Sequence, residues 1–253
     1  MDYERTAGMA ADGLLSYRDD QSGWQVCKKS NDVVVSWRPS SEFPGNVYKG
    51  EGVVGGSLAD VWKCLKPVPN GLRVKWDDNV KKFELLEQIT EDVSVCRTVT
   101  PSAAMGIISP RDFVDVILVK KYEDGTISSN ATNVIHPGCP PHSGYVRGFN
   151  HPCGCICSPI PGEPNKTLVL SFFQTDLGGL LPRSVVDSFF PSSMANFYSN
   201  LTKTPRFTSI YQSIKASPVN GPTVEMERTP PSLPPSIHPS IPPSIHPSLH
   251  RAK

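Results

Sequence analysis

Apolar and polar residues alternate in strand-length runs through much of the chain between residues 24 and 175. β-branched and aromatic residues dominate these runs, which is typical of strands with one buried face. Asp124 and Gly125 separate two of the runs and predict a hairpin with a two-residue type I′ turn, because glycine tolerates a positive φ. The expected strands span residues 24–29, 33–39, 46–54, 83–89, 93–100, 113–121, 126–135, 145–157 and 167–175.

Two segments with helical periodicity interrupt or precede these strands. The first spans about residues 5–19. Ser57 and Asp60 open the second, which we expect to run to Lys66. A hydroxyl and a carboxylate at this spacing cap the unpaired amides of a helix start.

A third helical segment follows the last strand and carries a single apolar stripe. Proline lacks the amide hydrogen that a helix interior needs, so we expect a kink at Pro191 and the end of the helix at Pro205. The stripe consists of Val186, Phe190, Met194, Phe197 and Leu201.

The order of these elements predicts an α+β fold in which a curved antiparallel sheet is closed by a long C-terminal helix. A strongly bent sheet of this length has a concave face that one helix cannot fill completely. We therefore expect an internal cavity.

Composition divides the chain into three parts. Residues 1–203 are periodic and globular, residues 204–216 are transitional, and residues 217–253 contain ten of the 26 prolines and no aromatic residue. The motif PPSIHPS occurs twice in this last part. Because proline removes backbone donors and restricts φ, we expect a disordered or partly polyproline II tail. One alternative function is an interaction scaffold that acts through this tail.

Charge and hydropathy exclude several classes of protein. The formal net charge is +1 and the basic residues are scattered among acidic ones, so we expect no nucleic-acid partner. No apolar run approaches the length of a membrane span, and no secretory leader opens the chain, which favours a cytoplasmic protein. An odd number of cysteines, seven, then favours free thiols.

Three of the cysteines lie at alternate positions in the segment HPCGCIC, at Cys153, Cys155 and Cys157. Alternate residues of a strand point to one face in a row and do not converge on a metal. The chain has no Cys-x-x-Cys pair, and apolar surroundings make thiols unreactive. We interpret this strand as a cavity wall or nearby core, with Gly154 marking a bulge or a close approach of another element. No metal and no cofactor are expected.

Catalysis has little support in the sequence. No set of Cys, His and Asp residues and no pair of carboxylates stands out. Arg111 and Asp112 are adjacent on an expected strand, so their side chains face opposite ways. An enzyme built on the same cavity remains an alternative, but we expect a protein without catalytic residues.

Several segments together resemble the START (StAR-related lipid transfer) domain family over about residues 10–201. The resemblance rests on SWRPSSEFPGNVYKGEGVV, GLRVKWDDNVKKFELLEQI, PSAAMGIISPRDFVDVILVKKYEDGTISSNAT, HPCGCIC, PGEPNKT and DLGGLLPRSVVDSFFPSSMANFY. It implies a helix-grip fold, whose sheet wraps a hydrophobic tunnel closed by the C-terminal helix. It also implies a monomeric carrier of one sterol, oxysterol or bile acid, which makes transient contact with membrane surfaces and is peripheral to intracellular membranes.

The chain departs from the resemblance at two places. Some cholesterol-binding relatives bury a Glu/Arg pair in the tunnel, whereas Thr98 and Ile117 occupy the positions that correspond here. After Leu201 the relatives continue as a helix, whereas this chain continues with TKTPRFTSIYQ.

The expected tunnel and gate residues come from three regions. The apolar loop 101–109 predicts a gate, because exposed apolar residues mark a contact surface. Asp115 shares a strand face with Ile117 and either contacts a ligand hydroxyl or, as we expect, lies at a wet end of the strand. The full set is Thr98, Met105, Ile107, Ile108, Asp115, Ile117, Asn130, Thr132, Cys155, Val186, Phe190 and Phe197.

Overall fold

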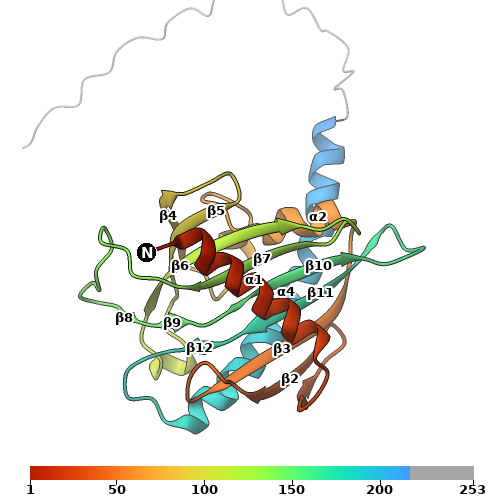
Figure 1. Ribbon diagram of the computed structural model, residues 1–253. Helices are drawn as coiled ribbons and strands as arrows, with labels where there is room; N and C mark the ends of the chain where they lie inside the picture. Colours follow the sequence, from red (N-terminus) through yellow and green to blue (C-terminus); the bar gives the residue numbers. More distant parts are fainter. Residues whose placement is uncertain (217–253) are drawn as a thin grey trace, which may run out of the picture. The chain divides into compact units, whose positions relative to one another are not determined.

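A large, mainly antiparallel sheet of ten strands dominates the structure (Figure 1). The computed structural model describes the backbone of residues 1–216, which form one compact unit, and the side chains of residues 1–204. The expected tail, 217–253, lies outside the described residues. The strand order is β1-β2-β3-β11-β10-β7-β6-β5-β4, with β8 paired in parallel beside β6. β9 and β12 form a separate two-stranded sheet.

Most of the alternating runs correspond in position to strands, although nine strands are expected and the described residues form twelve. They are β1 (Gln25–Lys29), β2 (Val34–Pro39), β3 (Asn46–Gly55), β4 (Lys82–Gln88), β5 (Val93–Val99), β6 (Arg111–Lys121), β7 (Ile127–Asn133), β8 (Val146–Arg147), β9 (Phe149–Asn150), β10 (Cys153–Pro159), β11 (Lys166–Phe173) and β12 (Thr175–Asp176). The helices are α1 (Tyr3–Asp19), α2 (Leu58–Leu65), α3 (Arg73–Trp76), the 3-10 turn η1 (Ala104–Gly106) and α4 (Arg183–Ala216).

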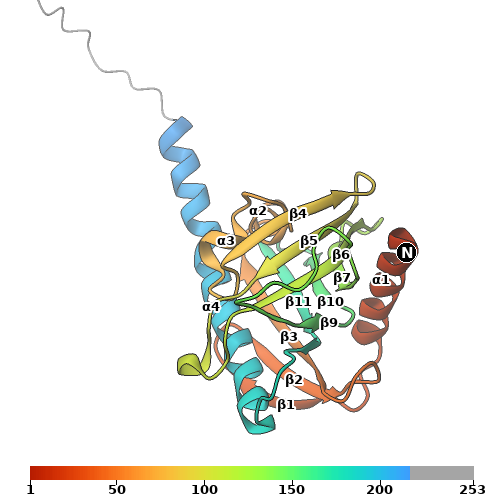
Figure 2. The same ribbon diagram turned by 90° about the vertical axis from the view of Figure 1, so that its left-hand side faces the viewer.

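The helices cover both faces of the sheet. Figure 2 shows α1 against the outer face, while α2, α3 and α4 lie on the inner face, which the strands curve around. The core between the inner face and α4 includes the fully buried Met194, Phe197, Tyr198 and Leu201. The predicted helix-grip fold is therefore confirmed.

The hairpin after β6 is present, but its turn is longer than predicted. The amide of Tyr122 donates to the carbonyl of Thr126, so three residues form the loop. Gly125 has a φ of 88°, whereas Asp124 does not have a positive φ. This is the pattern of a type I turn followed by a left-handed glycine, and not of a type I′ turn.

Two further expectations need correction. The run 145–157 is not one strand, because it is divided into β8, β9 and β10. The C-terminal helix does not end at Pro205 but continues to Ala216, across the segment that composition marks as transitional. Proline removes one helix hydrogen bond, yet its φ is compatible with a helix. The Thr204 hydroxyl also donates to the Asn200 carbonyl at 2.9 Å within the same turn.

Tyr198 attaches α4 to the inner face of the sheet. Its hydroxyl lies 3.0 Å from the carbonyl oxygen of Gly50, 2.9 Å from that of Val169 and 2.9 Å from the Ser171 hydroxyl. Its ring passes so close to β3 that a Cβ on Gly50 would lie 2.7 Å from it, and one on Gly52 2.9 Å from it. The two glycines therefore create the space in which this side chain docks.

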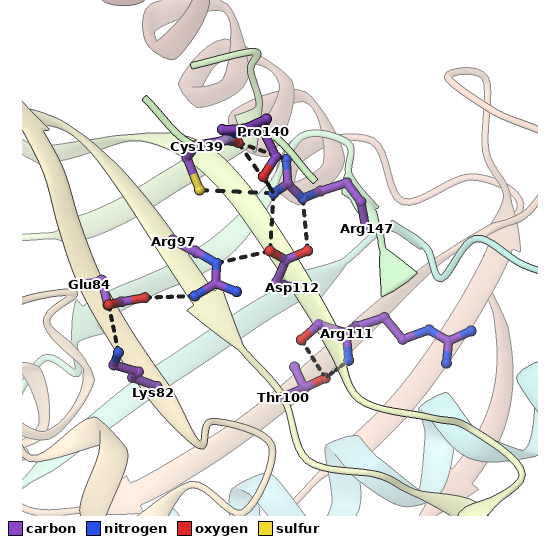
Figure 3. A network of polar contacts seen from close by, with 9 residues as sticks. All are labelled: Lys82, Glu84, Arg97, Thr100, Arg111, Asp112, Cys139, Pro140 and Arg147. Carbon is purple, nitrogen blue, oxygen red and sulfur yellow. Dashed lines mark hydrogen bonds and ion pairs between the residues drawn. The ribbon is translucent and has the colours of Figure 1, made fainter. Parts of the chain in front are cut away.

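A charged cluster on the outer face joins β4, β5, β6 and β8 (Figure 3). Asp112 is fully buried and accepts hydrogen bonds from Arg97 at 2.9 Å and from Arg147 at 2.8 and 3.0 Å. Arg97 also pairs with Glu84 at 2.8 Å. Burial by itself would raise the pKa of Asp112, but the hydrogen bonds from the two arginines outweigh it and lower this pKa.

We expect Asp112→Asn to lower the free energy of unfolding by about 2 kcal/mol at pH 7, because hydrogen bonds to a buried charge are lost. A lowered pKa means that this stabilisation is complete above the ordinary aspartate pKa and disappears as the pH falls through the folded-state value. Urea unfolding at pH 7 and at pH 3 measures both effects. The difference in the free energy of unfolding between the variant and the wild type should be smaller at pH 3 than at pH 7. An equal difference at the two pH values would contradict this account.

Candidate functional site

A cavity of about 660 Å³ lies on the inner face of the sheet and is bounded by β4 to β7, β9 to β12 and α4. Its volume falls within the range of pockets that enclose drug-sized ligands. Most of the wall is apolar. The apolar side chains include Val68, Val80, Phe83, Ala103, Ala104, Ile108, Phe113, Ile117, Ala131, Phe173, Leu177, Phe189 and Phe190.

Strand register explains which side chains form this wall. Ile117 on β6 is opposite Ala131 on β7, and Ala131 is in turn opposite Cys153 on β10. Paired residues of neighbouring strands point to the same face. All three line the cavity, so one line of small and medium side chains crosses its floor.

Asp115 lies on the cavity wall and is only 5% exposed. Its Oδ2 atom accepts a hydrogen bond from the Asn150 side chain at 2.8 Å, whereas Oδ1 has no partner. Burial raises the pKa of Asp115 to about 7, against the opposing effects of Asn150 and the charge of Arg147. The expectation of a wet strand end is therefore wrong.

An ion pair forms a second polar part of the wall. Arg73 of α3 donates to Asp77 at 2.6 Å, and the carboxylate is 1% exposed. The guanidinium also lies 5.0 Å from the ring centre of Phe197. Sequence analysis missed this pair because the segment around Trp76 shows no periodicity. The sequence does contain one indication of it, because Arg73 and Asp77 are four residues apart in GLRVKWDD, a spacing that brings side chains together on a helix.

The cysteines of β10 belong to the wall and the core, as the sequence predicts. Cys153 and Cys155 line the cavity, and Cys157 is fully buried beside them. Burial raises the pKa of Cys155 to about 11 and that of Cys153 well above its ordinary value. A Cβ on Gly154 would lie 1.9 Å from the carbonyl oxygen of Ser129 on β7, which confirms the close approach predicted there.

The loop 101–110 has one buried and two exposed apolar positions. Ile108 is 3% exposed and lines the cavity, whereas Met105 is fully exposed and Ile107 is 54% exposed. Ala104 and Met105 have positive φ values of 50° and 54°, which non-glycine residues rarely adopt. Two backbone hydrogen bonds join the residues on either side of this turn. The amide of Ala103 donates to the carbonyl of Ile108, and the amide of Ile108 donates to the carbonyl of Ala103.

Arg111 joins this loop to the segment that precedes α4. Its guanidinium donates to the carbonyl oxygens of Leu177 at 2.9 Å, Gly178 at 3.2 Å and Ser109 at 2.6 Å. It is 2% exposed, and burial lowers its pKa. Figure 3 shows its side chain pointing away from the Asp112 cluster, so the adjacent residues Arg111 and Asp112 do face opposite ways.

A smaller pocket of about 250 Å³ adjoins the cavity at the start of α4. Thr175, Leu177 and Phe190 line both spaces, so these side chains form the partition between them. Phe190 stacks on Tyr48 with 5.3 Å between ring centres. Val186, which the sequence places in the tunnel, lines only the smaller pocket.

Six of the twelve expected residues do not line the cavity: Met105, Ile107 and Val186, described above, and Asn130, Thr132 and Phe197. Asn130 and Thr132 lie on the opposite face of β7, because their neighbour Ala131 takes the inward position. Thr132 pairs with Val116, which packs in the cluster that contains Ala7 of α1. Phe197 is fully buried in the core and packs against Trp76, Phe173 and Tyr198. Thr98, Ile108, Asp115, Ile117, Cys155 and Phe190 do line it.

Within residues 1–204, whose side chains are described, His, Cys, Asp and Glu do not gather in groups of three or more that could hold a metal ion. Over residues 1–216, no helix is both long and apolar enough to cross a bilayer.

The sequence is similar to those of known lipid transfer proteins. The family model described as START domain matches residues 10–206. StAR-related lipid transfer protein 5 of Mus musculus is 65% identical over 196 residues, which cover 78% of this chain and 92% of that protein. StAR-related lipid transfer protein 6 of Homo sapiens is 38% identical over 200 residues, with coverage of 79% and 90%.

A solved structure gives the same result. The structure of human StAR-related lipid transfer protein 5 matches with a TM-score of 0.79 and 59% identity, and the match covers 82% of this chain and 98% of that one. The family model spans more than half of the chain, and the solved fold agrees with the sheet and the closing helix described above. The chain therefore belongs to the START domain family.

Proposed function

We propose that this protein carries one sterol or sterol-derived amphipath in the cavity and transfers it between membranes without changing it chemically. Cholesterol, an oxysterol and a bile acid all have the rigid apolar body that such a wall accommodates. The observation that carries the proposal is the 660 Å³ apolar space between the curved sheet and α4.

The affinity that this wall can provide suits a carrier. A sterol has roughly 28 heavy atoms, and about 0.3 kcal/mol per atom corresponds to about 8 kcal/mol, a dissociation constant near 1 µM. A carrier must release its ligand at the acceptor membrane. Binding of this strength allows both steps.

Release requires an opening, and the residues around the start of α4 supply the moving parts. The loop 101–110 and the segment before α4 lie at the same end of the molecule in both views (Figures 1 and 2). Both expose apolar side chains, since Leu180, like Met105, is fully exposed. We expect these side chains to enter the membrane surface, and Arg111 to keep the two segments together until they do.

A cavity enzyme is the alternative, and the chemistry of the wall argues against it. The described residues that line the cavity include neither histidine nor lysine, so no nucleophile has a base of that kind beside it. Both lining thiols have raised pKa values and are protonated at neutral pH. Asp115 and Asp77 are held by Asn150 and Arg73 and do not form a pair.

A transfer assay tests the proposal. Donor vesicles that contain labelled cholesterol, 25-hydroxycholesterol or cholic acid are mixed with acceptor vesicles, and the full chain is added in catalytic amounts. We expect faster transfer of at least one of these lipids, recovered chemically intact. Transfer at the uncatalysed rate for the whole panel, or conversion of the lipid to a product, would refute the proposal.

A further inference from the structure

One polar group on the cavity wall has unused hydrogen-bonding capacity. An ionised carboxylate offers about four acceptor positions, and a protonated one offers a donor as well. Asp115 makes a single hydrogen bond, to Asn150 at 2.8 Å, and its Oδ1 atom has no partner. Buried polar atoms in native proteins are nearly always paired, so an orphan here needs an explanation.

The neighbours of Asp115 hold it in place. The Thr175 hydroxyl donates to the side-chain oxygen of Asn150 at 2.7 Å, which directs the amide NH₂ of Asn150 at Asp115. The side chain of Asn133 donates to the backbone oxygen of Asn150 at 2.6 Å. Asp115, Asn150 and Thr175 all line the cavity. Residues from three strands thus fix the carboxyl group at the cavity wall. Such support by neighbouring hydrogen bonds is typical of groups that bind ligands.

The surroundings of this group are otherwise apolar or neutral. Phe113 and Ile117 flank Asp115 on the inner face of β6, and both line the cavity. The titratable groups near enough to interact electrostatically with it are Cys96 of β5, Cys153 of β10 and, from the outer face, Arg147 of β8. Burial raises the pKa of both thiols, so they stay protonated, and the guanidinium of Arg147 is engaged by Asp112.

We propose that Asp115, positioned by Asn150, is the polar subsite that binds the hydroxyl group of a hydroxylated steroid. This inference rests on the proposed function and names the ligand group that the cavity selects. A hydroxyl both donates and accepts, so it satisfies the carboxyl in either protonation state. A steroid without that hydroxyl covers the carboxyl group and leaves its Oδ1 atom without a partner. The subsite therefore discriminates mainly by rejecting the deoxygenated molecule.

A competition experiment tests this directly. The full chain is incubated with vesicles that contain equal amounts of cholesterol and its 3-deoxy analogue, cholest-5-ene, and native mass spectrometry measures the ratio of the two one-to-one adducts. We expect a ratio of at least about ten for the wild type. Asp115→Leu should bring the ratio close to one, whereas Asp115→Asn, which keeps a donor and an acceptor, should retain most of the preference.

A matched control separates this subsite from the general loss of a buried polar group. Thr167→Val removes a buried hydroxyl of β11 that does not line the cavity, without a change of size, and its ratio should equal that of the wild type. A normal ratio in Asp115→Leu, or an equal loss of the ratio in Thr167→Val, would overturn the inference while the adducts themselves still supported the proposed function. Absence of both adducts from the wild type would instead count against the proposed function and the inference together.

Thermal unfolding at two pH values tests whether the carboxyl group serves the fold instead of ligand binding. The pKa of Asp115 is raised on folding to about 7, so the folded state binds its proton more tightly and loses stability as the pH rises from 4 to 7. Asp115→Asn removes that loss. We expect this variant to melt at a higher temperature than the wild type at pH 8, and the difference to shrink at pH 4. A lower melting temperature at pH 8 would show that the carboxyl group serves the fold, and would overturn the inference.

Discussion

Ala131→Trp is expected to weaken lipid binding by at least about tenfold while the protein stays folded. Ala131 lies on the cavity floor, between Ile117 and Cys153 in the register of the sheet. An indole at this position occupies space that the ligand needs. The substitution adds apolar atoms to a space that is empty without ligand, so the cost to stability should be small.

The matched control for this variant is Val53→Trp. Val53 lies on β3, is 51% exposed and does not line the cavity. Val53→Trp therefore adds the same indole ring to the same sheet, but outside the cavity. Equilibrium binding of a fluorescent sterol compares the two variants with the wild type. Binding that is equally strong in all three proteins would show that the ligand does not occupy the cavity.

Tyr198→Ala is expected to lower the free energy of unfolding by about 4 kcal/mol, the cost of removing a large aromatic side chain from a core. The ring fills the space above Gly50 and Gly52, and the hydroxyl bonds to the sheet. Its loss therefore creates a cavity and also releases α4 from β3 and β11. Tyr198→Phe keeps the ring and should cost about 1 kcal/mol.

Urea denaturation monitored by circular dichroism measures both tyrosine variants. The ring and the hydroxyl contribute separately, so the two variants should differ by about 3 kcal/mol. Nearly equal stability of Tyr198→Ala and the wild type would mean that α4 is not fastened at this point.

The architecture could be predicted largely from the sequence, because period-two alternation and the apolar stripe after residue 180 are local signals. The extent of α4 could not. A proline at position 205 normally ends a helix, but it removes only one hydrogen bond, and the chain continues as a helix to Ala216. The turn at Gly125 was recognised as a hairpin, yet its length depends on the pairing of Tyr122 with Thr126.

The cavity wall could be predicted only in part, because inward and outward positions depend on register. Counting along β6 correctly places Asp115 and Ile117 on one face, since they are two residues apart. No such count connects β6 to β7, and a shift of one residue exchanges Ala131 for Asn130 or Thr132.

The polar groups of the wall were the least predictable feature. Asp115 accepts its hydrogen bond from Asn150 of β9, which Thr175 of β12 positions, and these two-residue strands have no pattern of their own. The Arg73–Asp77 pair belongs to a helix of four residues, which is too short to show periodicity. The environment of Asp115 thus depends on a contact between segments that are distant in the sequence, whereas the ion pair is local and only its place on the cavity wall depends on the fold.

Native mass spectrometry of the purified full chain, incubated with a panel of sterols, oxysterols and bile acids, tests the central claim most directly. The account predicts an adduct of one lipid per protein for at least one member of the panel, and its loss in Ala131→Trp but not in Val53→Trp. No adduct with any steroid, or an adduct that persists unchanged in Ala131→Trp, would contradict the assignment of the cavity as the binding site.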